Sequence, residues 1–189
     1  MDRRQEDEEI QKKRGAWTAM LAVASVLRGF NVEEKYCNVV TGPSMEPTIL
    51  HGDRLVGSRL DAGNITLKRG DIVVIDRRRK SSDEWAVKRI VALPGEKIEV
   101  EAIGSVLVNG RPLEEPYCKM DCDRDNEAQR PLVVPENHYY VMGDNRANSL
   151  DSRAYGPVPR GRIIVLFEFF YWPPEKISTD LYALRPFFK

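Results

Sequence analysis

The sequence predicts a mostly β fold of folded antiparallel sheets, forming a β-barrel-like domain with a looped insertion and one N-terminal hydrophobic helix. From Val39 onward, short apolar runs alternate with turn-forming residues, which is the pattern of an all-β domain. Twelve prolines and thirteen glycines are spread along the 189 residues, which favours a loop-rich β protein over a helical bundle. The Asn109–Gly110 pair indicates a tight hairpin, because both residues accept a positive φ.

Seven segments have the length and composition of β-strands, each bounded by turn-forming residues. They are Arg54–Ser58, Asp71–Asp76, Trp85–Leu93, Lys97–Ala102, Val106–Val108, His138–Met142 and Ile163–Phe170. The stretch Pro116–Pro131 is polar, contains cysteine and lacks periodicity. We therefore expect a hairpin and looped insertion over about residues 103–137, within a folded domain of residues 36–175.

The amino terminus combines a charged tail with an apolar segment. Residues 1–14 are charged throughout and are expected to be a tail. Residues 15–27 carry no charge, and the stretch becomes long enough to cross a bilayer if Arg28 extends to the interface and residues 15–32 all contribute. The basic residues 12–14 predict a cytoplasmic amino terminus. We expect a membrane anchor over residues 15–32, with an amphipathic helix as the alternative; residues 176–189 are expected to be a C-terminal tail.

The bulk composition excludes several classes of function. Lysine plus arginine equals aspartate plus glutamate, 29 each, so nothing in the charge balance indicates a nucleic-acid partner. The cysteines Cys37, Cys118 and Cys122 are too few for a disulfide framework, although Cys118 and Cys122 are spaced to close a small loop. With only His51 and His138 to add, a metal site is not expected.

One lysine lies in an unusually apolar strand. Because side chains alternate along a strand, Lys88 should share a face with Ala86, Ile90 and Ala92, while Arg89 points the opposite way. A lysine shielded in this way can be neutral near pH 7 and can act as a base. The alternative is a lysine at a sheet edge whose amine extends to water.

Ser44 lies in the turn Thr41-Gly42-Pro43-Ser44-Met45-Glu46-Pro47-Thr48. Glycine and two prolines restrict the backbone, so the serine hydroxyl and nearby N–H groups would be held in one orientation. Neither histidine belongs to a segment that resembles a Ser-His-Asp arrangement. A nucleophilic serine in this chain would therefore need another base, although a serine between prolines is commonly only a turn residue.

Four runs of residues resemble the type I signal peptidase (leader peptidase) family, which uses a serine/lysine dyad and includes the mitochondrial inner membrane peptidases. They are GPSMEPTI, RGDIVV, VKRIVALPGEKIEV and VMGDNRANSLDSRAYGPV, in the family's order between Gly42 and Val158. The hairpin text VNGRPLEEPY is also similar to bacterial members. Together these motifs span most of the chain, from Gly42 to Val158.

The resemblance implies roles for particular residues. Ser44 matches the nucleophile, with its N–H in the oxyanion hole, and Lys88 matches the general base. Ser149 matches a serine that hydrogen-bonds and orients the lysine amine. The residues implied to line shallow substrate pockets for small side chains are Val40, Met45, Ala86 and Val87.

A charged cluster and one departure complete the comparison with the family. The cluster consists of Asp144, Arg146, Asp151 and Arg153, which we interpret as structural ion pairs around the active site. Many bacterial members have serine or threonine two residues before the nucleophile, where this chain has Gly42. Either a second backbone N–H or the hydroxyl of Thr41 replaces that donor, or the activity is intrinsically low.

The implied function is that of a membrane-bound serine endopeptidase that removes signal peptides from exported preproteins after a small residue, without metal or organic cofactor. The implied partners are preproteins, the lipid bilayer and secretion machinery. The implied location is a bacterial inner (plasma) membrane with the catalytic domain outside, or alternatively the mitochondrial inner membrane. Two further functions stay open, a self-cleaving Ser-Lys regulator and an inactive β-module.

Overall fold

The computed structural model describes residues 35–60, 65–77, 85–102, 104–118 and 129–172. The expected anchor at residues 15–32, the tails at 1–14 and 176–189, and Cys122 lie outside these ranges. Among the residues described, no helix combines the length and apolar character needed to cross a membrane.

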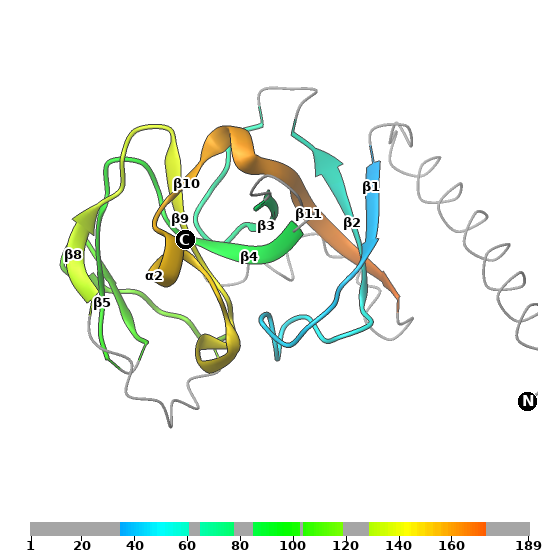
Figure 1. Ribbon diagram of the computed structural model, residues 1–189, viewed down its shortest axis with the longest axis horizontal. Coiled ribbons are helices and arrows are strands. Elements are labelled where there is room, and N and C mark those ends of the chain that lie inside the picture. Colours follow the sequence, from blue (N-terminus) through cyan, green and yellow to red (C-terminus); the bar gives the residue numbers. More distant parts are fainter. Residues whose placement is uncertain (1–34, 61–64, 78–84, 103, 119–128, 173–189) are drawn as a thin grey trace, which may run out of the picture. The chain divides into compact units, whose positions relative to one another are not determined.

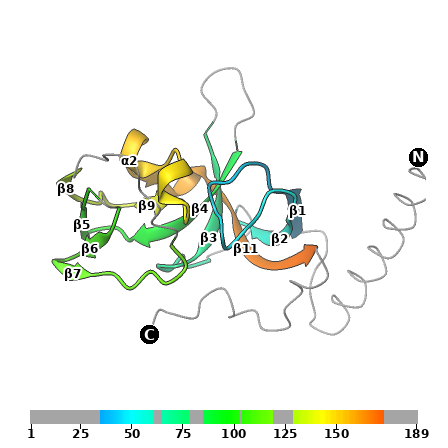
Figure 2. The ribbon, with the colours of Figure 1, turned by 90° about the horizontal axis from the view of Figure 1, so that it is seen from below.

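Two antiparallel sheets account for the described fold (Figures 1 and 2). The larger has seven strands in the order β1-β2-β11-β3-β4-β9-β10, and the smaller has four in the order β7-β6-β5-β8. The strands of the larger sheet are β1 (Lys35–Val39), β2 (Arg54–Arg59), β3 (Ile72–Asp76), β4 (Trp85–Ala92), β9 (His138–Met142), β10 (Val158–Pro159) and β11 (Ile163–Trp172). Those of the smaller sheet are β5 (Lys97–Val100), β6 (Val106–Val108), β7 (Arg111–Pro112) and β8 (Gln129–Val133). Short helical turns, η2 (Arg146–Asn148), α2 (Ser152–Tyr155) and η3 (Arg160–Arg162), connect β9, β10 and β11.

The mostly β prediction is confirmed, but the described sheet does not close into a barrel. Its order is open, with β1 and β10 as the two edges. Both views place β5 and β8 to one side of β9 and place β1, β2 and β11 to the other (Figures 1 and 2). The result is a folded sheet with a smaller sheet beside it.

All seven predicted strands are present, with ends that differ by a few residues at most. The strands that sequence patterning missed are β1, β7, β8 and β10. The segment of β8, QRPLV, overlaps the stretch that was expected to be loop, and it forms a strand by pairing with β5 at an edge of the smaller sheet. An edge position tolerates proline, which lacks an N–H for a second neighbour. The expected hairpin is confirmed: Asn109 and Gly110 have φ of 52° and 75° between β6 and β7.

The pairing of β3 with β4 fixes the two faces of the sheet near residue 88. Val73 lies opposite Lys88 and Ile75 opposite Ala86, so these side chains share one face, whose core also contains Ile90. The prediction that Lys88 shares a face with Ala86 and Ile90 is therefore confirmed. Ala92 instead packs in the core beneath the smaller sheet, because the pairing of β4 with β9 shifts register between residues 90 and 92.

Candidate active site

The turn that carries Ser44 is fixed by buried neighbours. Met45 and Ile49 are 1% and 0% exposed and pack with Ile72 and Phe167. The Ile49 N–H donates to the Met45 carbonyl at 2.9 Å, which closes the turn. Because Met45 is anchored in the core, the adjacent Ser44 is held at a defined position.

A second segment, which follows β9, clamps the same turn. The Asn145 backbone N–H donates to the Ser44 carbonyl, and its side-chain amide donates to the Pro43 carbonyl, each at 3.2 Å. The Thr48 hydroxyl donates to Asp144 at 2.6 Å. A Cβ placed on Gly143 would overlap the Ser44 carbonyl oxygen. The backbone of the two segments is therefore in close contact, and only glycine fits at residue 143.

The amine of Lys88 contacts the hydroxyl of Ser44. Its Nζ lies 2.8 Å from the Ser44 Oγ and 2.8 Å from the Val87 carbonyl oxygen. The residue is 3% exposed and forms no ion pair with a carboxylate among the described residues. A buried amine thus has a hydroxyl and a carbonyl as its neighbours, not a counter-ion.

Burial lowers the pKa of Lys88 from 10.5 to about 8, because an ammonium group is poorly solvated there. The charges of Asp151 and Asp144 oppose this shift, while those of Arg77 and Arg153 reinforce it. With a pKa of about 8, about one amine in ten is neutral at pH 7. The arrangement can therefore supply a basic amine beside a hydroxyl at neutral pH.

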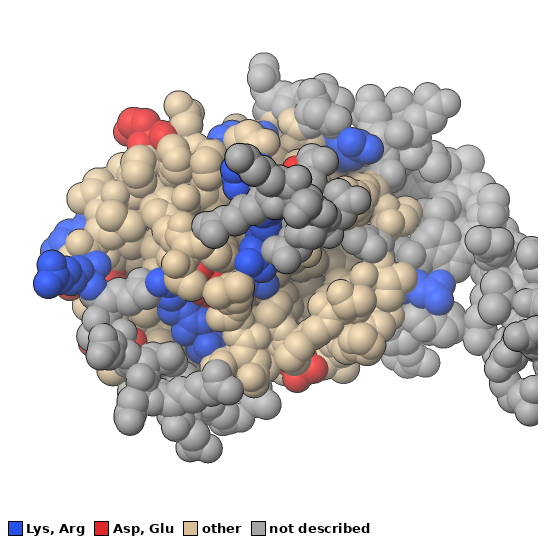
Figure 3. All heavy atoms as spheres, viewed as in Figure 1, with Lys and Arg blue, Asp and Glu red and all other residues tan. Residues whose placement is uncertain are grey.

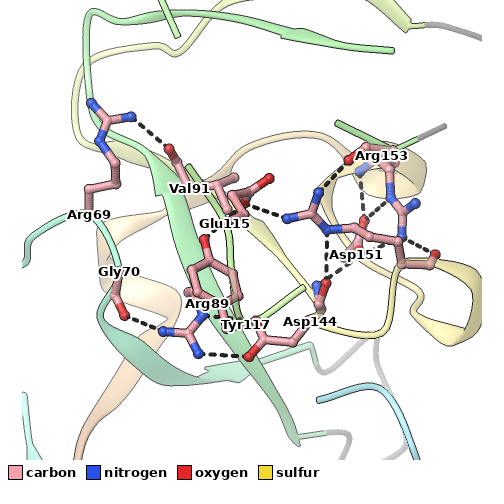
Figure 4. A network of polar contacts seen from close by, with 12 residues as sticks. Arg69, Gly70, Arg89, Val91, Glu115, Tyr117, Asp144, Asp151 and Arg153 are labelled. Carbon is pink, nitrogen blue, oxygen red and sulfur yellow. Dashed lines mark hydrogen bonds and ion pairs between the residues drawn. The ribbon is translucent and has the colours of Figure 1, made fainter. Parts of the chain in front are cut away.

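The predicted charged cluster forms a hydrogen-bonded network that extends beyond its own motif (Figure 4). Asp144 accepts two hydrogen bonds from Arg89, at 2.8 and 2.7 Å, and both side chains are buried. Arg146 pairs with Glu115 at 2.5 Å, and both are 1% exposed at the side chain. Sequence reasoning named neither Arg89 nor Glu115 as partners.

Asp151 and Arg153 form the pair that lies within the motif, at 2.9 Å. Burial would raise the pKa of Asp151, but the hydrogen bonds from Arg153 and from the Gly143 N–H outweigh it and hold the pKa low. Asp151 also caps α2 by accepting from the Arg153 N–H. The loop that contains Ser149 is therefore tied to β9.

Two expected positions differ in the structure. The Ser149 Oγ is buried but has no hydrogen-bond partner among the described residues, so the contact with the Lys88 amine is not formed. Its side chain instead packs against Gly143. Met45 belongs to the core and is absent from the wall of the cavity beside Ser44. In each case packing against a neighbour determines where the side chain lies.

A cavity of about 260 Å³ opens beside Ser44. The predicted pocket residues Val40, Ala86 and Val87 line it. Its other lining residues, besides Ser44 and Lys88, are Val39, Thr41, Gly42, Val74, Arg77, Trp85 and Leu150. Val74 could have been inferred from strand pairing, since it lies opposite Val87, whereas Leu150 is brought in by a loop that no local pattern predicts.

The backbone before Ser44 has a further contact. The Gly42 N–H donates to the His51 Nδ1 at 3.2 Å, and Gly42 has a φ of 90°, which favours glycine. This N–H is therefore directed at the imidazole. Within the described residues no group of three His, Cys, Asp or Glu side chains is placed to hold a metal ion.

Comparison with known proteins finds the family that the sequence motifs of this chain resemble. The profile of the family described as "Signal peptidase, peptidase S26" matches residues 12–172. A protein named signal peptidase I from Leptolyngbya laminosa is 35% identical over 164 residues, covering 84% of this chain and 77% of that protein. Signal peptidase I P from Bacillus subtilis subsp. natto is 33% identical over 185 residues, covering 90% of this chain and 97% of that protein. A crystal structure of a signal peptidase I from Enterococcus faecalis V583 has a TM-score of 0.46 and 27% identity, covering 55% of this chain and 98% of that one.

The profile match spans most of the chain, including the segments of Ser44, Lys88 and Ser149. Two relatives exceed 30% identity while this chain covers more than two thirds of each. The chain therefore belongs to the signal peptidase family, peptidase S26.

Proposed function

We propose that this protein is a membrane-bound type I signal peptidase, a serine endopeptidase that cleaves signal peptides from exported preproteins with Ser44 as nucleophile and Lys88 as general base. Family membership supports the activity. The observation that carries the assignment of residues is the 2.8 Å contact between the Lys88 Nζ and the Ser44 Oγ at a buried site where the described part of the chain supplies no carboxylate partner.

The first step is acylation. When Lys88 is neutral, its lone pair accepts the Ser44 proton while Oγ attacks the substrate carbonyl carbon. The resulting ammonium then gives that proton to the leaving amine, and the peptide C–N bond breaks. In the second step Lys88 takes a proton from a water molecule as that water attacks the ester carbon. The ester C–O bond breaks, the Ser44 Oγ takes the proton back from the Lys88 ammonium, and the signal peptide leaves with a new carboxyl group. Every proton taken up by the amine is returned, so no metal or cofactor is required.

The oxyanion would accept a hydrogen bond from the Ser44 N–H. Gly42 supplies no side-chain donor, and its N–H is directed to His51. The Thr41 hydroxyl remains as a candidate for the second donor, because Thr41 lines the same cavity. Loss of one donor to the oxyanion lowers kcat by a factor of roughly 10² to 10³. The second donor therefore has a large influence on the rate of this enzyme.

The substrate would bind as an added strand. β9 pairs with β4 only at Arg89, Ile90 and Ala92, so the segment Trp85–Lys88 has no described strand on the side away from β3. An extended peptide can pair with such an edge through backbone hydrogen bonds. The small side chains before the cut would enter the cavity beside Val87.

The anchor and location belong to the same proposal. We place a membrane anchor at residues 15–32, the amino terminus in the cytoplasm, and the domain of residues 36–175 outside a bacterial plasma membrane. The apolar, uncharged sequence and the basic residues before it support this topology. Substrates held in the same bilayer would then reach the Ser44 cavity by diffusion in two dimensions.

The test uses the full chain in detergent with a panel of preproteins, followed by sequencing of the new amino termini. Cleavage is expected after a small residue, and Ser44→Ala and Lys88→Ala should each reduce it by on the order of 10⁴-fold. Lys97→Ala is the matched control, because Lys97 has a side chain 51% exposed in the smaller sheet. The rate should rise with pH through about 8, where half of the Lys88 amines are neutral. Normal processing by a folded Lys88→Ala protein would refute the dyad.

A further inference from the structure

A larger cavity, of about 540 Å³, adjoins the Ser44 cavity, and the two share Arg77 and Leu150 in their walls. The larger cavity lies between the end of β3, α2 and the chain from β10 to η3. Its remaining lining residues are Ile75, Asp76, Ala154, Tyr155, Pro157, Val158, Pro159 and Arg162. Neither Ser44 nor Lys88 lines it. A group bound near Ser44 could therefore extend into a second, roomier space.

The polar groups of this second cavity favour a ligand with hydrogen-bond acceptors. Arg77 and Arg162 contribute two positive charges and Asp76 one negative charge. The Arg77 guanidinium lies over the Tyr155 ring, 5.3 Å from its centroid. The Tyr155 hydroxyl is buried and has no partner among the described residues. A buried hydroxyl is normally hydrogen-bonded, so an acceptor oxygen from a ligand would complete this wall.

Strand geometry indicates which part of a substrate would reach it. A peptide strand on the open edge of Trp85–Lys88 would direct successive side chains to opposite faces. Val74 and Val87 are paired on one face and line the Ser44 cavity, which Ala86 and Lys88 of the opposite face also border. Ile75, which is paired with Ala86 on that opposite face, lines the second cavity and not the Ser44 cavity. The substrate side chains one and three residues before the cut would enter the Ser44 cavity. The side chain two residues before the cut would point toward the second.

We propose that the second cavity is a specificity subsite that binds a long acidic side chain, such as glutamate, two residues before the scissile bond. This inference rests on the proposed function. The bound carboxylate would accept hydrogen bonds from Arg162 and Tyr155, with Arg77 at the entrance. Figure 3 shows Lys and Arg side chains gathered in the middle of this face, over the part where Figure 1 places β3 and β4.

The experiment compares peptides that differ only at that position, Ala-X-Ala before the cut with X as Glu, Gln, Ala or Lys. Glu is expected to give a kcat/KM about fivefold above Ala, with Gln between them and Lys below Ala. Arg162→Glu should reverse the order of Glu and Lys. Arg130→Glu, at an exposed position of β8, makes the same charge change away from the cavity and should leave the order intact.

The outcomes separate the two proposals. Equal cleavage of all four peptides by the unmodified protein would overturn the subsite while leaving the peptidase assignment in place, and this measurement does not depend on any variant folding. A Glu preference that survives Arg162→Glu, in a protein with unchanged thermal unfolding, would also overturn it. Failure to cleave any peptide or preprotein would instead overturn the proposed function, and this inference with it.

Discussion

Lys88 and Arg89 are consecutive basic residues of β4, 3% and 2% exposed, yet their surroundings differ completely. Lys88 has a hydroxyl and a carbonyl as hydrogen-bond partners, and burial lowers its pKa to about 8. Arg89 donates twice to Asp144 and also to the Gly70 carbonyl, and it lies 3.9 Å from the centroid of the Tyr117 ring. Burial disfavours the charge of Arg89 too, but Asp144 outweighs burial and raises its pKa.

The comparison shows that burial alone does not decide the charge of a basic side chain. The strand gives both residues similar burial and directs them to opposite faces, and the partner on each face decides the rest. An unpaired buried amine is a reactive group that destabilises the fold in its charged form. A paired buried guanidinium is unreactive, and it holds Asp144 beside the Ser44 turn.

Removal of the partner of Arg89 should have the largest effect on stability. Asp144→Ala leaves a buried guanidinium without its counter-ion, so the free energy of unfolding should fall by about 3–5 kcal/mol. Urea unfolding monitored by circular dichroism measures this change. The control is Lys97→Ala, which breaks the Lys97–Glu99 pair, with side chains 51% and 31% exposed, and should cost less than about 1 kcal/mol. Equal losses in the two variants would contradict this contrast between buried and exposed pairs.

Removal of the buried charge of Lys88 should instead raise the free energy of unfolding. In the unfolded chain Lys88 titrates near 10.5 and in the folded protein near 8, so between these pH values the unfolded state binds more protons. Stability from this group therefore rises with pH from about 8 to 10.5 and is lowest below 8. Lys88→Met should raise the free energy of unfolding by about 3 kcal/mol at pH 7, because it removes a buried ammonium group whose pKa burial lowers from 10.5 to about 8.

Unfolding by urea at a series of pH values tests the same variant against the unmodified protein. The difference in unfolding free energy between the two should shrink as pH rises through the window from about 8 to 10.5. A Lys88→Met protein that is less stable at pH 7, or a difference that does not change with pH, would show that Lys88 is not destabilised by burial.

The contact between the two segments around Ser44 can be tested at Gly143. An added Cβ there would overlap the Ser44 carbonyl and the Ser149 side chain, so Gly143→Ala must displace the turn. We expect a loss of about 1–3 kcal/mol in stability and on the order of 10²-fold in kcat/KM, because Ser44 moves relative to Lys88. Gly161→Ala is the control, since no described residue lies within 4 Å of its added Cβ. An unchanged rate in Gly143→Ala would mean that this contact does not position Ser44.

The smallest expected effect concerns the aromatic neighbour of Arg89. Tyr117→Phe removes the hydroxyl that donates to Glu115 at 2.8 Å but keeps the ring over Arg89. The unfolding free energy should fall by about 1 kcal/mol or less. Tyr139→Phe is the control, because it removes the hydroxyl of a ring that packs against the hydrophobic core and lies outside this network, and it should change the unfolding free energy less. A loss above about 3 kcal/mol on thermal unfolding would indicate that the hydroxyl holds the network together.

Much of this site follows from local sequence. The period of the strand separates Lys88 from Arg89, the prolines and glycine around Ser44 restrict its turn, and Asn109–Gly110 closes the predicted hairpin. These features depend on the backbone preferences of residues close together in the chain, so they can be predicted from the sequence. The resemblance to the family further predicts that the segments of Ser44, Lys88 and Ser149 form one active site.

Tertiary structure alone decided which side chains meet. Asp144 was expected within a cluster of its own motif, yet its partner is Arg89, 55 residues earlier, and Arg146 reaches Glu115, 31 residues earlier. The strand β8 exists through pairing with β5, and the Ser149 hydroxyl packs beside Gly143 without bonding to Lys88. Such contacts depend on strand register, bulges and packing between distant segments, and no pattern of neighbouring residues encodes that geometry.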